Sequence, residues 1–283
     1  MSDRIIYILL PVHNRLNVTM RFAAQLLAQK TQSFHLILLD DGSTDGTTEA
    51  IRAILGEKVT VFKGRGDWWW GGALQVGYDL IKSGRIACKD EDIIGIMNDD
   101  SMFGPNLFSR VFEAFDSYEG QICLVATATN MSSQRSYVGA SVKWVPFRIQ
   151  LVVDARSMDC APTRALYMKS RDFKASGGFW PKRIPHYFAD YEFTFRIREQ
   201  GCRFVCPPDM TIEFTEAESG AVRLQSNTIK DRLRTIFSVK CNHNPMPWSW
   251  FIARHGRPRV LMPLALIQIW LRAMLRVVFP SSD

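Results

Sequence analysis

Short apolar runs alternate with segments of helical spacing over the first 120 residues. Apolar, often β-branched residues fill 4–10, 34–39, 59–62 and 93–97, and each run stops at turn-forming residues. Between these runs, apolar positions recur with the period of a helix at about 17–30, 45–55, 71–83 and 105–118. Strand–helix alternation of this kind predicts an α/β fold with a Rossmann-like, mostly parallel central sheet flanked by helices.

The pattern changes after residue 120. Strand-like stretches at 124–129, 149–154 and 164–168 predict an irregular β-rich segment, followed by a helix over 189–200 and a strand at 203–206. Beyond residue 220, several prolines predict a tail divided into short helical pieces. We therefore expect an α/β domain over 1–220 and a C-terminal helical extension over 221–283.

Positive charge is concentrated in this extension. The 283 residues carry a formal net charge of +7, and 47% of them are hydrophobic, which excludes a disordered or fibrous chain. Residues 221–283 hold ten Lys or Arg and two acidic residues, a net charge of +8, whereas residues 1–220 hold 25 basic and 26 acidic residues. A basic tail suits a solvated face, an anionic membrane surface or nucleic acid.

The tail favours a membrane or a second subunit over nucleic acid. It contains no recognised nucleic-acid module, and the neutral body offers no basic groove, so we expect no nucleic-acid partner. The apolar run at 260–271 spans 12 residues, fewer than the ~20 of a transmembrane helix. Tryptophans interleaved with arginines are typical of an interfacial segment. The alternatives are therefore peripheral binding to an anionic membrane surface and packing across a homodimer.

The cysteines and the N-terminus indicate where the protein resides. The six cysteines show no paired metal-binding spacing, and the chain runs from Met-Ser-Asp-Arg directly into an apolar strand. We expect reduced thiols in the cytoplasm, with the protein peripheral on the inner membrane face.

Polar residues follow the predicted strands, at the edge where parallel α/β sheets bind ligands. Residues 11–15 (PVHNR) follow the first strand, 40–47 (DDGSTDGT) the second and 98–100 (NDD) the fourth. A calcium loop at 40–47 is excluded because Arg52 falls where a bidentate carboxylate is required. A plain turn explains the glycines and hydroxyls, but not two carboxylates directly after a buried strand.

Residues 66–72 (GDWWWGG) place three tryptophans side by side after the third strand. A single helix or strand cannot turn all three toward one core. At least one tryptophan is therefore expected to line a cleft, where aromatic faces suit sugar or base rings.

Taken in order, these blocks resemble the motifs of family 2 glycosyltransferases with the GT-A fold. Residues 40–47 are similar to the family's DDGSTDGT signature, 11–15 to the segment after its first strand, and 98–100 to its DXD-like metal motif. Residues 186–196 (HYFADYEFTFR) resemble the acidic stretch that holds its catalytic base. The likeness covers about residues 4–206.

The resemblance implies an inverting, metal-dependent transfer of a sugar from a nucleotide-sugar donor, with Mg²⁺ or Mn²⁺ as cofactor. The acceptor would be a hydroxyl of a lipid-linked or cell-surface saccharide. The tryptophan–glycine run is similar to that of rhamnosyltransferase-like members, which points to dTDP-rhamnose, with a UDP-sugar as the other donor considered. The alternative is a non-catalytic nucleotide-sugar or glycan binding subunit on the same fold.

The resemblance also assigns roles to residues. It implies that Asp190 is the general base, with Glu192 second, although a Glu192–Arg196 pair on one helix face is expected to be structural. It implies that Asp100 is a metal ligand, with Asp99 beside it. The nucleotide-sugar is expected to contact Pro11, His13, Asn14, Arg15, Asp40, Asp41, Gly42, Ser43, Trp70, Gly71, Asn98 and Asp99.

Two departures from the family pattern concern the metal. Asn98 stands where many members carry Asp, and an amide binds magnesium less strongly than a carboxylate. Residues 207–220 contain no histidine to complete the site. The third ligand is left open among Glu213, Glu216, Glu218 and His186.

Overall fold

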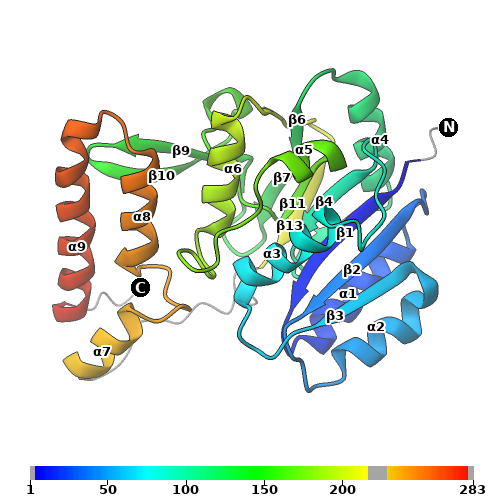
Figure 1. Cartoon of the computed structure of the whole chain (residues 1–283), viewed down its shortest axis with the longest axis horizontal. Helices are drawn as coiled ribbons and strands as arrows, with labels where there is room; N and C mark the ends of the chain where they lie inside the picture. The colour runs from blue at the N-terminus through cyan, green and yellow to red at the C-terminus, as the bar shows by residue number, and fades with distance from the viewer. Residues whose placement is uncertain (1–3, 216–227, 280–283) are drawn as a thin grey trace.

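The structure, a computed structural model, describes residues 4–215 and 228–279 (Figure 1). The strands are β1 (Ile6–Val12), β2 (Phe34–Asp40), β3 (Val59–Lys63), β4 (Ile93–Met97), β5 (Met102–Phe103), β6 (Ile122–Val125), β7 (Thr127–Asn130), β8 (Arg135–Tyr137), β9 (Gly139–Trp144), β10 (Phe147–Val152), β11 (Ala165–Lys169), β12 (Arg203–Val205) and β13 (Thr211–Phe214). The helices are α1 (Leu16–Leu27), α2 (Thr47–Leu55), α3 (Trp69–Lys82), α4 (Leu107–Ser117), α5 (Ser170–Ala175), α6 (Ala189–Glu199), α7 (Ile229–Ile236), α8 (Pro245–His255) and α9 (Met262–Val278), with short 3₁₀ turns at η1 (Gly56–Lys58), η2 (Ala155–Ser157) and η4 (Arg259–Leu261).

A seven-stranded sheet forms the centre of the fold, in the order β12-β6-β11-β4-β1-β2-β3. Strands β3, β2, β1 and β4 are parallel neighbours, as the alternating pattern predicts. Strand β11 runs antiparallel to both β4 and β6, and β12 is parallel to β6. The predicted mostly parallel sheet is confirmed, and β11 is the reversed strand within it.

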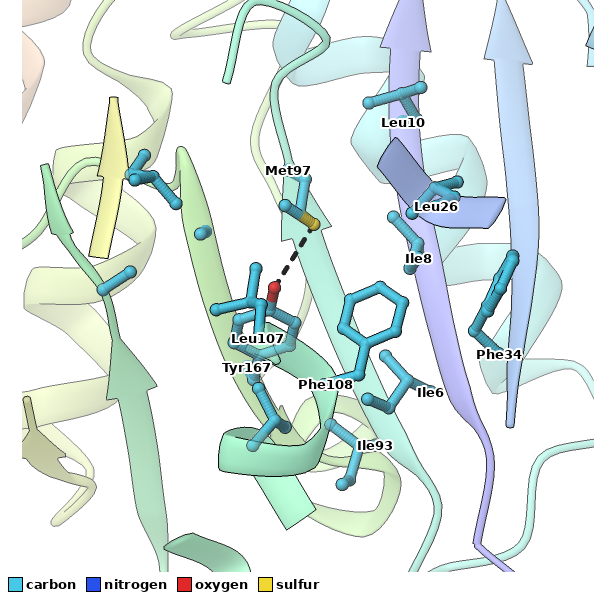
Figure 2. Close-up of a cluster of buried hydrophobic side chains, with 14 of the residues drawn as sticks. Ile6, Ile8, Leu10, Leu26, Phe34, Ile93, Met97, Leu107, Phe108 and Tyr167 are labelled. Carbon is cyan, nitrogen blue, oxygen red and sulfur yellow. Dashed lines mark hydrogen bonds between the residues drawn. The ribbon is translucent and has the colours of Figure 1, made fainter. Parts of the chain in front are cut away.

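Helices cover both faces of the sheet (Figure 1). On one face, apolar residues of α1, α2 and α4 join one buried cluster, and on the other face α3, α5 and α6 join a second. Figure 2 shows part of the first cluster, where Phe108 of α4 lies beside Phe34 of β2, with ring centres 5.7 Å apart. The hydroxyl of Tyr167, fully buried in this cluster, donates to the sulfur of Met97 at 3.3 Å.

The β-rich segment after residue 120 forms more than one sheet. The expected single strand at 124–129 is divided at Ala126, where the backbone leaves the central sheet and enters a smaller one. The smaller sheet has the order β5-β13-β7-β8, and β9 and β10 form a separate hairpin. The other predicted strands and helices occur, with bounds shifted by a few residues.

The C-terminal extension packs on this hairpin and on α6. Apolar and aromatic residues of α8 and α9 form one buried cluster with residues of β9, β10 and the start of α6. The prediction of a tail in short pieces is wrong for α9, which runs for 17 residues. Its Pro263 lies in the first turn, where a missing N–H leaves no hydrogen bond unmade.

One face of α9 is buried and the opposite face is apolar and exposed. The apolar run at 260–271 is too short to cross a membrane. Among the described residues, the longer helical segment Arg259–Val278 has the length and composition of a membrane-crossing helix. Its buried positions share one side and contact α8 and α7. The large apolar side chains on the exposed side are Val260, Leu264, Ile267, Leu271, Leu275 and Val278.

Candidate active site

Asp40 stabilises the loop that follows β2. Its carboxylate accepts the Ser43 N–H at 2.8 Å and the hydroxyl proton of Thr48, and the side chain is fully buried. Gly42 in the same loop has φ +76°, and a Cβ there would lie 2.9 Å from the Gly66 nitrogen. One carboxylate oxygen of Asp40 therefore has its partner in the loop, and the other has its partner in the first turn of α2.

Asp41 ties this loop to the tryptophan segment. Its carboxylate accepts the N–H of Gly66 and the N–H of Trp69, both at 2.9 Å. Its backbone oxygen lies 2.6 Å from the His13 ring nitrogen Nδ1. The structure thus brings the ends of β1 and β2 and the start of α3 together at one edge of the sheet.

The segment after β1 is fixed by the loop after β2. Asn14 has φ +52°, and its side-chain oxygen accepts the Thr44 N–H at 2.8 Å while its own N–H donates to Ser43 Oγ at 2.9 Å. Pro11 lies within β1, in register with Leu39. These hydrogen bonds join the segment after β1 and the loop after β2 into a single folded unit.

Two acid–arginine pairs follow β4. Asp99 accepts from Arg15 Nε at 2.8 Å and from Thr19 Oγ1 at 3.0 Å. Asp100 accepts from Arg164 Nη1 at 2.9 Å. Both carboxylates are buried. Loss of water raises the pKa of Asp99, the positive charge of Arg15 opposes this rise, and the negative charge of Asp100 adds to it.

The adjacent tryptophans point to three different neighbours. A Cβ on Gly64 would meet the ring of Trp68 at 2.7 Å, and the ring of Trp69 lies 5.9 Å from that of His186. Trp70 Nε1 donates to Asn98 Oδ1 at 3.3 Å. One of the three therefore reaches the NDD motif.

Gly71 brings α3 against the loop that leads to Asp190. Its N–H donates to the Pro185 oxygen at 2.8 Å, and a Cβ there would lie 2.8 Å from the Ile184 oxygen and 3.3 Å from the Ala189 Cβ. Only a residue without a side chain permits this approach. The glycine thereby fixes the distance between the tryptophan segment and the first turn of α6.

Asp190 lies in that first turn, partly buried. Burial raises its pKa to about 6, opposed by the Tyr191 N–H, which donates to its carboxylate at 2.8 Å, and by the positive charge of Arg164. Burial raises the pKa of the Tyr137 phenol. Its interaction with Arg164 lowers this pKa, and the negative charges of Asp190 and Asp100 raise it. Arg164 therefore pairs with the carboxylate after β4 and is near enough to the carboxylate of α6 to lower its pKa.

Glu192, the second candidate base, is occupied elsewhere. It is 2% exposed, and its carboxylate accepts from Arg196 Nε at 2.9 Å and lies 3.3 Å from His255 Nε2. Arg196 also donates to the backbone oxygens of Ser176 and Gly178. The expected Glu192–Arg196 pair is present, and its burial fits a structural role.

Arg164 and Tyr137 are site residues that the sequence reasoning did not single out. The rule for parallel sheets points to the carboxyl ends of strands, whereas Arg164 immediately precedes β11. Because β11 runs antiparallel to β4, with Ala165 opposite Met97, the start of β11 reaches the edge where β4 ends. A charged residue directly before an apolar strand was the available signal.

Among the described residues, no group of three His, Cys, Asp or Glu side chains is placed to hold a metal ion. Glu213 is exposed on β13, while Glu216 and Glu218 lie outside the described residues. His186 has its pKa lowered to about 4 by burial and by Lys240, so its ring is neutral at physiological pH. Its Nδ1 is buried without a hydrogen-bond partner in the described part of the chain.

The chain matches the family model of glycosyl transferase family 2 over residues 7–173. This match covers more than half of the sequence, and the protein belongs to that family. It is therefore a glycosyltransferase. A comparison with curated protein sequences finds no match.

Several solved structures share the fold. PcManGT, a mannosyltransferase from Pyrobaculum calidifontis solved with GDP-Man and Mn²⁺, has a TM-score of 0.54 at 14% identity, over 98% of this chain and 76% of that one. GalNAc-T7 with UDP, GalNAc and Mn²⁺ gives 0.60 at 13% identity, over 96% of this chain and 54% of that one. TarS 1–349 of S. aureus gives 0.59 at 13% identity, over 97% and 81%. These likenesses concern the fold, and they confirm the predicted GT-A type.

Proposed function

We propose that this glycosyltransferase is an inverting enzyme that uses a nucleotide-sugar donor and a divalent cation, with Asp190 as its general base. The observation that carries the proposal is the placement of Arg164, which pairs with Asp100 and also acts on Asp190. Carboxylates far apart in the sequence thus share one cationic neighbour. This arrangement supports a single pocket with a leaving-group side and a base side.

Asp190 suits the removal of the acceptor proton. A base works best when its pKa lies near the working pH, and a pKa of about 6 leaves most of the carboxylate ionised at neutral pH. The first turn of α6 and the Tyr191 N–H hold the carboxylate in place. Attack of the acceptor oxygen on the face opposite the leaving nucleotide would invert the anomeric carbon.

The residues after β4 fit a divalent cation. Asp99 and Asp100 are adjacent buried carboxylates, and Mg²⁺ or Mn²⁺ is commonly held by one or two carboxylates together with substrate phosphates. Asp100, with Asp99 beside it, would hold the ion. When bound, the cation would neutralise charge on the departing diphosphate. Arg15 and Arg164, which pair with these carboxylates, would contact the same phosphates.

The loops after β1 and β2 support a nucleoside pocket. Asp41 sits between His13 and the tryptophan segment, where a carboxylate can accept from a base N–H or a ribose hydroxyl. Asp40 would act by shaping the loop, because its side chain is fully buried and its oxygens accept from Ser43 and Thr48.

A thermal-shift screen tests donor binding. Nucleotide-sugars carrying UDP, GDP or dTDP are added to wild-type protein and to Asp100→Asn, each with and without Mn²⁺. We expect at least one donor to raise the melting temperature of the wild type only with Mn²⁺, because a ligand that binds the native state alone stabilises it. The shift should be much smaller in Asp100→Asn. A shift independent of both the metal and Asp100 would contradict the metal assignment.

We further propose that the exposed face of α9 lies on an anionic membrane surface, which would bring the enzyme to a lipid-linked acceptor on the cytoplasmic side. Five large apolar side chains of α9, with Val260 just before it, line this face, and no Asp or Glu occurs from residue 232 to residue 282. Each basic residue near an anionic leaflet contributes about 1 kcal/mol, so part of the tail's excess charge is sufficient for reversible binding.

Liposome flotation tests this membrane proposal with substitutions on the exposed face, since α8 and α9 also form part of the core. Leu264, Ile267 and Leu271 are changed together to Ser. We expect wild type to float with anionic vesicles and the triple variant to remain in the dense fraction. Equal flotation would refute the proposal, and so would a wild-type dimer that the triple variant converts to a monomer.

A further inference from the structure

A cavity of about 590 Å³ lies beside the first turn of α6 and is not used by the donor site described above. Its walls come from β10, the loop before α6, the segment 242–245, and one side of α9. Cavities of this size hold small-molecule ligands in other proteins. The lining residues that matter are three arginines and five aromatic side chains: Arg148, Arg272, Arg276, Phe147, Tyr187, Phe188, Tyr191 and Trp248.

The cavity is positively charged. Arg148 projects from β10, while Arg272 and Arg276 are one turn apart on α9. No Asp or Glu is among the residues that line it. Arg272 also donates to the Phe147 oxygen at 3.0 Å, which holds one guanidinium in place at the wall. Guanidinium groups gathered in this way match the oxygens of a phosphate ester.

The rest of the wall is aromatic and closely packed. Ring centres of Phe188 and Trp248 are 4.3 Å apart, and those of Phe147 and Trp248 are 5.6 Å apart. Rigid aromatic walls favour the apolar face of a sugar or an alkyl chain over small hydrated ions. The combination fits a phosphate ester that carries an apolar or saccharide group.

The cavity is next to the general base. Phe188 and Tyr191 line it, and Asp190 lies between them in the sequence, at the start of α6. A ligand seated against these two rings therefore lies beside the turn that carries Asp190. The opposite side of α9 is the exposed apolar face, so one helix borders both surfaces.

We infer that this cavity holds the phosphate or diphosphate ester of the acceptor, so that the acceptor's sugar hydroxyl reaches Asp190. The inference rests on the proposed function, because the ester is an acceptor only if the protein transfers sugar as proposed. Binding of a phosphate ester in the cavity can be measured separately. The three arginines would be binding residues for the ester, whereas Asp190 would act on the hydroxyl.

Calorimetric titration tests the binding without any need for transfer. The probes are dodecyl phosphate below its micelle concentration, uncharged dodecyl maltoside and inorganic phosphate. The proteins are wild type, Arg148→Gln/Arg276→Gln, and a matched control, Lys230→Gln/Arg257→Gln. The control removes two exposed tail charges that do not line the cavity. UDP, GDP and dTDP are each titrated with Mn²⁺ into each protein to measure the donor site independently.

We expect wild type and the control to bind dodecyl phosphate at least tenfold more tightly than the cavity variant, since one charge-assisted contact is worth at least that factor. Inorganic phosphate and dodecyl maltoside should bind weakly to all three proteins. Affinity for the nucleotide that binds with Mn²⁺ should be the same in all three proteins. If the double variant does not fold, Arg276→Gln alone is used, with a smaller expected loss.

Several results would overturn the inference. Equal affinity for dodecyl phosphate in the cavity and control variants would show that the arginines do not bind it. Inorganic phosphate binding as tightly as dodecyl phosphate would indicate a simple anion site, and dodecyl maltoside doing so would indicate a detergent surface. Failure of all three nucleotides to bind wild type with Mn²⁺ would count against the proposed function and leave the cavity result unaffected.

Discussion

Replacing Arg164 by Gln should move the pH dependence of transfer. In the wild type, Asp190 has a pKa of about 6, and the positive charge of Arg164 holds it below the value that burial alone would give. The base must be ionised to accept a proton, so kcat/KM should rise with pH through about 6. Without the guanidinium, the pKa of Asp190 should rise further, because the carboxylate loses a favourable opposite charge.

The size of this shift can be worked out. A nearby opposite charge typically changes a carboxyl pKa by one unit or more, and we take a midpoint of about 7 for the variant. At pH 6 the ionised fraction would then fall from about a half to about a tenth, whereas above pH 8 the two proteins would differ little in ionisation. The ratio of variant to wild-type activity should therefore increase about fivefold between pH 6 and pH 8.

The assay is kcat/KM from pH 5 to pH 9, with the donor found by thermal shift and saturating Mn²⁺. Arg15→Gln is the matched control, because Arg15 pairs with Asp99 and does not act on Asp190. Both variants are expected to have a lower maximal kcat/KM, but only Arg164→Gln should move the pH at which kcat/KM is half of its maximum. A midpoint that stays near 6 in Arg164→Gln, or moves equally in Arg15→Gln, would refute the proximity of Arg164 to the base.

Other substitutions test the packing that positions the site. Arg196→Met should lower the free energy of unfolding, measured by urea titration, by about 3–5 kcal/mol. The reason is that the buried Glu192 carboxylate loses its guanidinium partner. A change below about 1 kcal/mol would show that the pair is not structural. Glu192→Gln should remain active once folded, and loss of turnover with normal stability would favour Glu192 as the base. Gly71→Ala should reduce kcat with little effect on donor affinity, since a methyl group would push the loop before Asp190 away from α3. An unchanged kcat would show that this contact does not determine the position of Asp190.

Much of the central sheet is predictable because parallel strands buried on both faces leave apolar runs with polar ends. Strands β1, β2 and β4 have this pattern, whereas β3 lies at the edge of the sheet with its residues partly or fully exposed. The ends of these strands carry the motifs that the structure brings together. The division of residues 124–129 at Ala126 was not predictable from periodicity, because both halves are strand-like and only their partners differ.

The role of individual motif residues depends on hydrogen bonds that spacing does not reveal. Asp40 and Asp41 are neighbours of the same type, yet one shapes its own loop and the other contacts the tryptophan segment. Spacing does not reveal Arg164, because the direction of β11 in the sheet decides which of its ends reaches the site. Pro263 predicts a break in the tail, but it lies in the first turn of α9, where proline is compatible with a helix.

The most direct test of the central claim is the turnover of Asp190→Asn measured beside its donor affinity. The substitution keeps the size of the side chain but removes the oxygen that takes the acceptor proton. We predict a loss of at least ~10²-fold in kcat, with affinity for the metal–donor pair within about twofold of wild type. Turnover close to that of wild type would contradict the account, whatever the donor proves to be.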